Sequence, residues 1–164
     1  MNYKILIIVR HAKSSWEHNV SDVERPLKTR GVRDASLIAK EFKSKNYSID
    51  AVYSSPANRA LSTCNIFKDI LGWSPDLIEN DEELYDFSGE QVINFIKNID
   101  NQLETVVIFG HNHALTSIIN LMGDKYIDNL PTSGLVVLKF DIDSWKYAKY
   151  GQTELIMFPR DYRP

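Results

Sequence analysis

Two short and almost wholly apolar runs, residues 5–9 and 105–109, constrain the fold of this 164-residue chain more than any other feature. Both are rich in β-branched residues and neither alternates with polar ones, a pattern typical of strands that are covered on both faces. Segments with helical spacing of apolar residues follow each run along the chain. Strands that alternate with helices imply parallel pairing through right-handed crossovers. The pattern therefore predicts an α/β fold, a three-layer α/β/α sandwich with a mainly parallel central sheet.

The rest of the chain continues this alternation. No linker or internal repeat interrupts it, so we expect a single domain over residues 1–164, with a loose tail at 160–164. Thr29 and Ser88 are placed to cap two of the helices. The further elements that we expect are helices over 29–45, 56–71, 88–99 and 111–122, and strands over 51–54, 77–78, 135–140 and 154–158.

The composition excludes several classes of protein. The net charge is −3, so no overall positive field attracts nucleic acid or an acidic membrane. The single cysteine, Cys64, cannot form an intramolecular disulfide or a multi-cysteine zinc site, and we interpret it as a buried small hydrophobe. The run 5–9 is too short for a signal peptide or a membrane span, and no later segment is long enough to span. We therefore expect a cytoplasmic protein in which any anion-binding site is local.

Arginine and histidine residues follow three of the predicted strands at the point where each strand ends. Arg10 and His11 come directly after the first strand, Arg59 lies in the helical turn after residues 51–54, and His111 follows residues 105–109. In an open α/β sheet, ligands bind beyond the carboxyl ends of the strands, so these side chains should meet at one edge. No carboxylate adjoins any of the three strand ends, as a metal site would require. We expect neither a metal nor an organic cofactor.

Such a cluster suits a compact multivalent anion, and phosphate fits best. A guanidinium group donates two parallel hydrogen bonds to phosphate oxygens, and the helix N-termini add backbone N–H groups. The same donors stabilise the charge that spreads over the phosphoryl oxygens during transfer. A neutral imidazole can attack phosphorus, and flanking arginines disfavour its protonated form. His11 is therefore the expected nucleophile, and His111 the expected partner of the phosphoryl group.

These residues also resemble the motifs of a known family, the histidine phosphatase superfamily. Val9-Arg10-His11-Ala12 is similar to its Arg-His signature, residues 54–63 to a second motif whose arginine binds phosphate, and Gly110-His111-Asn112 to its second-histidine motif. Arg25-Pro26-Leu27, with Gly31 shortly after and no large inserted cap, resembles the SixA-like phosphohistidine phosphatase branch. The resemblance runs from Tyr3 to about residue 140.

This resemblance implies a phosphoglycerate-mutase-like fold without a large cap insertion. It also implies a phosphatase that removes phosphate from a histidine on a partner protein, through a covalent phospho-His11 intermediate, and releases inorganic phosphate. In this sequence the implied catalytic residues are Arg10, His11, Arg59 and His111, and the implied substrate contacts are Arg25, Ser54 and Asn112.

The leaving-group acid and the substrate stay open at this point. Larger members of the family have a glycine where this chain has Ala12, and they carry a glutamate whose best positional match is Glu83. Alternative functions are a phosphatase for small phosphomonoesters that uses Glu83 as general acid, and a non-catalytic phosphate-dependent binding module. The tryptophan at position 16 lies in a loop that should border the pocket and could contact a partner. The other candidate acids are Asp22, Asp81 and Glu82.

Overall fold

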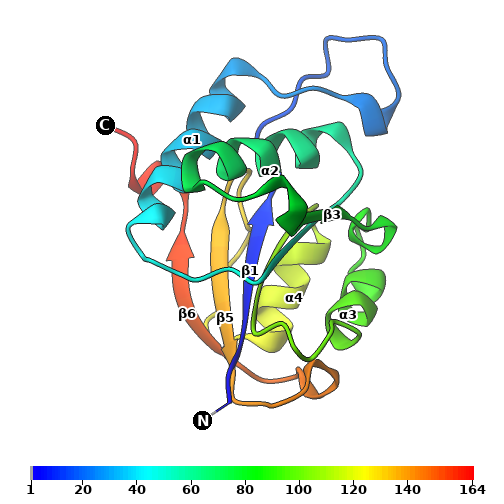
Figure 1. The fold of residues 1–164 in the computed structure, drawn as a ribbon. Helices are drawn as coiled ribbons and strands as arrows, with labels where there is room; N and C mark the ends of the chain where they lie inside the picture. Colours follow the sequence, from blue (N-terminus) through cyan, green and yellow to red (C-terminus); the bar gives the residue numbers. More distant parts are fainter. Residues whose placement is uncertain (1) are drawn as a thin grey trace.

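A six-stranded sheet runs through the computed structural model, which describes residues 2–164 (Figure 1). Its strands are β1 (Lys4–Arg10), β2 (Ala51–Ser54), β3 (Ile78–Asn80), β4 (Thr105–Gly110), β5 (Leu135–Phe140) and β6 (Gln152–Met157). The strand order is β3-β2-β4-β1-β5-β6. The first four strands in the chain are parallel to one another, β5 is antiparallel to β1, and β6 is antiparallel to β5. The predicted mainly parallel α/β fold is confirmed.

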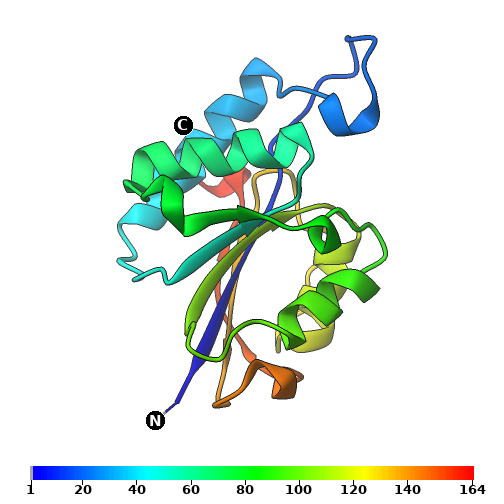
Figure 2. The ribbon, with the colours of Figure 1, turned by 45° about the vertical axis from the view of Figure 1, so that its right-hand side comes forward.

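Helices cover both faces of this sheet, two on each face (Figure 2). They are α1 (Thr29–Lys43), α2 (Asn58–Leu71), α3 (Glu90–Lys97) and α4 (Ala114–Met122). Ile7 and Val9 belong to the buried cluster beneath α1 and α2, and Leu6 and Ile8 to the cluster beneath α3 and α4. Alternate residues of β1 thus face opposite apolar layers. This arrangement explains why the strand reads as a continuous apolar run.

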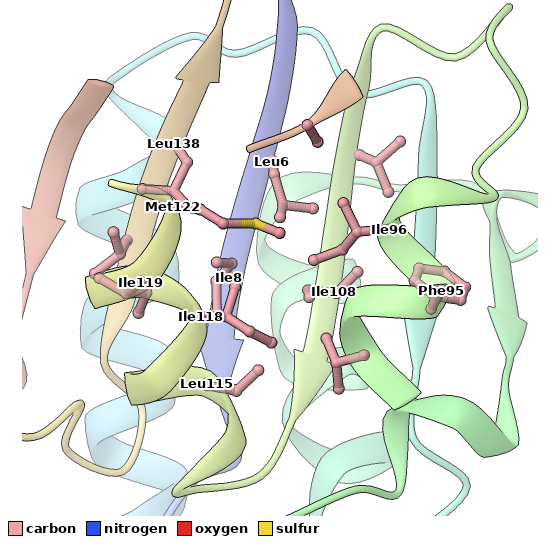
Figure 3. Close-up of a cluster of buried hydrophobic side chains, with 14 of the residues drawn as sticks. Leu6, Ile8, Phe95, Ile96, Ile108, Leu115, Ile118, Ile119, Met122 and Leu138 are labelled. Carbon is pink, nitrogen blue, oxygen red and sulfur yellow. The ribbon is translucent and has the colours of Figure 1, made fainter. Parts of the chain in front are cut away.

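Figure 3 shows the half of the core beneath α3 and α4, where side chains of both central strands pack against both helices. Full burial of one such aliphatic side chain contributes about 1.5–3 kcal/mol to folding, so the two clusters hold β1 and β4 firmly in place. The residues of this cluster that Figure 3 labels are Leu6, Ile8, Phe95, Ile96, Ile108, Leu115, Ile118, Ile119, Met122 and Leu138.

No helix within residues 2–164 is both long enough and apolar enough to cross a membrane.

The three strands that carry the predicted site end at the same level of the sheet. Arg10 at the end of β1 pairs with Gly110 at the end of β4. Ser54 at the end of β2 pairs with Phe109, one residue before the end of β4. The residues that follow these strand ends therefore leave the sheet next to one another.

The helix caps differ from the predicted ones. Thr29 is the first residue of α1 and its side chain makes no capping hydrogen bond. Helix α3 begins at Glu90, and Asp86 caps it in place of Ser88 because an ionised carboxylate accepts several N–H groups at once. The Asp86 Oδ2 atom accepts the backbone N–H groups of Gly89, Gln91 and Val92 at 3.0, 3.1 and 3.1 Å.

The C-terminal segment is also more ordered than the predicted loose tail. A 3₁₀ turn forms at Pro159–Asp161, and Arg163 then donates two hydrogen bonds to the buried Asp34 carboxylate of α1. The Nε–Oδ1 and Nη2–Oδ2 distances are 3.1 and 2.6 Å. This paired contact fixes the end of the chain against α1.

Gly31 allows α1 to pack on the loop that follows β1. A Cβ atom at this position would overlap the Lys13 carbonyl oxygen and lie 2.9 Å from the Lys13 amide nitrogen. We expect Gly31→Ala to lower the free energy of unfolding by about 1–3 kcal/mol, although alanine is the better helix former. Equilibrium urea unfolding measures this change. Ser36→Ala, on the half-exposed side of the same helix, should stay within about 0.5 kcal/mol of the native protein, and an equal loss in both variants would contradict the packing account.

Candidate active site

His11 and His111 lie side by side where β1 and β4 end. The backbone N–H of His11 donates to the Gly110 carbonyl at 3.1 Å, and the backbone N–H of Ser55 donates to the Phe109 carbonyl at 3.0 Å. These two bonds continue the hydrogen bonding between β1 and β4 and between β2 and β4 by one residue beyond the strand ends. The ring centroids of the two histidines are 5.3 Å apart. The predicted meeting of strand ends is therefore present in the structure.

A cavity of about 300 Å³ opens over these strand ends. Three arginines and Lys13 line it, and its only lining carboxylate within residues 2–164 belongs to Asp22. The cavity is thus locally positive in a chain whose net charge is −3. This size and charge suit a small multivalent anion. The full set of lining residues is Arg10, His11, Lys13, Ser14, Trp16, Asp22, Arg25, Arg59, Phe87, Asn112 and Thr132.

The His11 ring presents one free nitrogen. Its Nδ1 lies 2.8 Å from the Ala12 carbonyl oxygen, which can only accept, so Nδ1 carries the proton and Nε2 keeps its lone pair. Burial lowers the pKa of His11 to about 4; the Ala12 hydrogen bond opposes this shift, and the nearby guanidinium groups add to it. His11 is therefore neutral at pH 7, as a nucleophile requires. Burial, rather than the predicted arginine charges, is the main cause.

The methyl group of Ala12 fits within the buried cluster beneath α1 and α2. The Ala12 N–H donates to Thr63 Oγ1 at 2.8 Å, and Thr63 Oγ1 donates to the Arg59 carbonyl at 2.7 Å. These two bonds tie the loop that carries His11 to the first turns of α2. Alanine in place of the glycine of larger relatives is thus accommodated.

Asp22 connects two of the arginines to an aromatic residue. Its carboxylate accepts hydrogen bonds from Arg59 Nη2 at 3.0 Å, Arg25 Nη1 at 3.2 Å and the Tyr85 hydroxyl at 2.6 Å. Partial burial would raise the pKa of Asp22, but these hydrogen bonds outweigh it and lower the pKa to about 2. Asp22 is therefore ionised at neutral pH and orients Arg25 and Arg59 within the cavity.

Several buried polar atoms in this region have no hydrogen-bond partner. Within residues 2–164 these atoms are Arg10 Nε, Arg59 Nε, His111 Nδ1 and Ser133 Oγ. The first three belong to the predicted phosphate pocket, and the Ser133 N–H donates to the carbonyl groups of Arg10 and His11. An unpaired buried donor costs about 1–3 kcal/mol, so their concentration at one place indicates a binding site. The donors fit an oxyanion.

His111 is fully buried beneath two aromatic rings. Its Nε2 lies 2.8 Å from Ser55 Oγ, and the centroids of Tyr85 and Phe87 lie 5.3 and 5.0 Å from that of the histidine. Burial lowers the pKa of His111 to about 3; the neighbouring His11 ring and the Arg59 and Arg10 guanidinium groups add to this shift, and the Asp22 carboxylate opposes it. In this structure His111 is a neutral ring that can donate one N–H.

Three predicted site residues, His111, Glu83 and Ser54, lie outside the cavity lining. The buried His111 ring lies directly behind it, against the lining residues His11 and Phe87. The Glu83 carboxylate accepts a hydrogen bond from Asn94 Nδ2 at 2.6 Å, on the exposed side of α3, and Ser54 Oγ donates to the Ser55 carbonyl at 2.9 Å. Asp81 and Glu82 are not lining residues either. Arg25 and Asn112 do line the cavity, and their contact with a substrate stays a prediction.

The sequence did not indicate three residues that contact His111 in the structure. Ser55, one position beyond Ser54, is the serine that contacts His111. Tyr85 and Phe87 follow the acidic segment in which Glu83 was favoured, and they cover His111 where an acid was expected. The aromatic spacing at 85 and 87 was the available signal.

A model of the histidine phosphatase superfamily (branch 1) matches residues 6–91, slightly more than half of the chain. This chain belongs to the histidine phosphatase superfamily. Similar solved structures include the protein histidine phosphatase SixA complexed with tungstate, with a TM-score of 0.82 and 22% identity over 97% of this chain and 99% of that one. A phosphoglycerate mutase from Bacillus anthracis has a TM-score of 0.64 and 16% identity, over 90% of this chain and 96% of that chain.

An uncharacterized protein of Mycobacterium tuberculosis is 26% identical over 161 residues, which cover 92% of this chain and 98% of that protein. The phosphoglycerate-mutase-like fold and the SixA likeness predicted from the motifs are confirmed. Membership of the superfamily supports a phosphatase activity for this chain.

The buried neutral histidines make stability depend on pH. Because the pKa of His11 is about 4 in the folded protein and about 6.5 when unfolded, only the unfolded chain gains a proton between these values. The stabilising contribution of neutral His11 to the free energy of unfolding should therefore be complete above pH 6.5. It should fall by roughly 3 kcal/mol as the pH falls to 4. Urea unfolding across this range, with the native protein and His11→Gln, measures the contribution.

The His11→Gln variant should have a flatter stability profile between pH 6.5 and 4. His18→Gln, at an exposed position, is the matched control and should keep the native slope. Asp22 titrates below this window, since its pKa is about 2. Identical slopes for His11→Gln and the native protein would contradict a buried neutral His11.

Proposed function

We propose that this chain hydrolyses phosphohistidine on a partner protein through a phospho-His11 intermediate. The observation that carries the proposal is a cavity with a neutral imidazole and a cluster of cations, but with one lining carboxyl group whose pKa is about 2. Such a cavity has a nucleophile and anion donors without a protonated carboxylic acid. It suits a substrate whose leaving group departs readily.

The reaction has two displacements. His11 Nε2 attacks phosphorus as the bond between phosphorus and the substrate imidazole nitrogen breaks, and the departing nitrogen takes a proton from solvent. Water then attacks the phosphoryl group, the bond from phosphorus to Nε2 breaks, and inorganic phosphate leaves while Nε2 regains its lone pair. Arg10, Arg59 and His111 are the proposed donors to the phosphoryl oxygens, and their buried unpaired nitrogens support this role. Tungstate, bound in the similar SixA structure, is a tetrahedral oxyanion like phosphate.

The leaving group distinguishes phosphohistidine from an ester. An alkoxide needs a proton as it departs, whereas an imidazole leaves far more readily. Glu83 lies outside the cavity lining and is hydrogen-bonded to Asn94, and Asp22 is ionised. This arrangement favours a substrate with a P–N bond over small phosphomonoesters.

The rim of the cavity favours a protein as the carrier of that histidine. Trp16 and Phe87 line the cavity, yet 75% and 47% of their surfaces are exposed. The Arg25 guanidinium lies 3.2 Å from the centroid of the Trp16 ring and holds it in place. Exposed, preorganised aromatic residues are typical anchors of protein interfaces. The predicted role of Trp16 as a partner contact therefore forms part of the proposal, as does a cytoplasmic location.

A parallel assay tests this function. A phosphohistidine-containing carrier protein and glycerol 2-phosphate, an ester with an alkoxide leaving group, are each incubated with the native protein, His11→Ala and Glu83→Gln. We expect fast phosphate release from the carrier, at least 100-fold slower release with His11→Ala, and less than a twofold change with Glu83→Gln, because general acid catalysis typically contributes 100-fold or more where it operates.

His18→Ala is the control for loss of an imidazole away from the site and should behave as the native protein. A preference for the ester that Glu83→Gln abolishes would replace this proposal with a small-ester phosphatase. Binding of the phosphorylated carrier without any release would indicate a binding module instead.

A further inference from the structure

A second hollow with positive side chains lies beside α1, outside the phosphate cavity. It has a volume of about 620 Å³ and runs between the outer side of α1 and the C-terminal residues Arg163 and Pro164. Figure 1 shows this end of the chain next to α1. The lining residues from the helix include Arg30, Arg33, Leu37 and Lys40, whose spacing of three or four places them along one face. We refer to this hollow as the α1 groove.

The α1 groove carries more positive than negative side chains. Asp34 is the only acidic side chain in its lining within residues 2–164, and both Asp34 oxygens accept hydrogen bonds from Arg163. No ion pair involves Arg30, Arg33 or Lys40 in the part of the chain that the structure describes. One face of α1 thus presents three positive side chains without an ion pair, in a chain whose net charge is −3. They favour an acidic ligand.

Part of the groove lining is apolar. Val32 is 43% exposed, and Leu37 and Pro164 also line the hollow. Nucleic acid binding would need a longer track of cations along the phosphate backbone, and the negative net charge opposes it. A polypeptide segment with acidic and apolar side chains matches both the cations and the apolar lining residues.

One end of the α1 groove lies near the loop that follows β1, because Arg30 lines the groove and its neighbour Gly31 packs on Lys13 of that loop. Val9 pairs with Leu135, and Leu135 pairs with Met157, so the last residue of β6 is level with the next-to-last residue of β1. The segment after Met157 therefore starts about 10 Å from β1, two strand spacings away, and its residues Arg163 and Pro164 line the groove. Lys13 itself lines the phosphate cavity.

We propose that the α1 groove binds an acidic segment of the protein that presents the phosphohistidine. This inference rests on the proposed function. A typical interface buries about 800 Å² on each partner, a patch about 30 Å across. A protein whose phosphohistidine enters the cavity is therefore large enough to cover the groove as well. Charge pairing here speeds encounter and orients the partner before its phosphoryl group reaches His11.

Charge reversal tests the groove separately from the chemistry. The double variant Arg33→Glu/Lys40→Glu changes two exposed residues that lie outside the cavity lining. Its kcat/KM is measured for a phosphohistidine-containing carrier protein and for phosphoimidazole, which is too small to reach the groove. We expect at least a tenfold loss on the carrier and a change within twofold on phosphoimidazole. The native rate on the carrier should fall as salt rises, and the variant rate should depend less on salt.

Lys97→Glu/Lys125→Glu makes the same change in net charge at exposed positions on the side of α3 and α4. It should keep kcat/KM on both substrates within twofold of the native value. Equal rates on the carrier for the native protein and the groove variant would overturn the docking role while the proposed function stands. Failure of the native protein to cleave the carrier would overturn both. Weaker binding of a labelled RNA oligonucleotide to the groove variant, with unchanged carrier kinetics, would replace the acidic protein segment with a nucleic acid.

Discussion

The active site depends on two buried parallel strands, β1 and β4, that end at the same level of the sheet. Arg10 and Gly110 pair in the ladder between β1 and β4, so the next residues, His11 and His111, leave the sheet with their rings 5.3 Å apart. Apolar side chains pack on both faces of both strands, and neither can shift without disturbing two cores. The nucleophile is therefore positioned by two strands that are packed on both faces. Catalysis benefits from such positioning because little entropy remains to be lost at the reacting atom.

Burial at this edge links stability to chemistry. The same exclusion of water that keeps His11 neutral at pH 7, with its pKa at about 4, also makes the folded protein sensitive to acid. The cavity gathers three guanidinium groups near that ring, and Asp22 with the Tyr85 hydroxyl orients two of them. The Asp22 carboxylate thus orients the Arg25 and Arg59 guanidinium groups, and the cavity lining still carries more positive than negative groups. The unpaired nitrogens of Arg10 and Arg59 remain for an anion.

Local patterns predicted the strands and the residues at their ends, because apolar runs and strand exits are short-range features. Arg10, His11, Arg59 and His111 follow from that rule alone. Contacts between distant segments did not follow: Asp22 meets Arg59 and Tyr85 across separations of 37 and 63 residues. The position of Glu83 depends on a hydrogen bond to α3 that no motif indicates. The cap of α3 was missed because Asp86 lies before the predicted Ser88, and its carboxylate accepts more N–H groups.

The central claim is that phosphate passes through a covalent bond to His11 Nε2. Rapid mixing of the protein with a ³²P-labelled phosphohistidine carrier, followed by an alkaline quench that preserves P–N bonds and by peptide mapping, tests it most directly. The account predicts a label that appears and decays on the peptide containing His11, is absent from His11→Ala, and is unchanged in His18→Ala. Label on the peptide containing His111, or turnover with no labelled protein at any time, would contradict it.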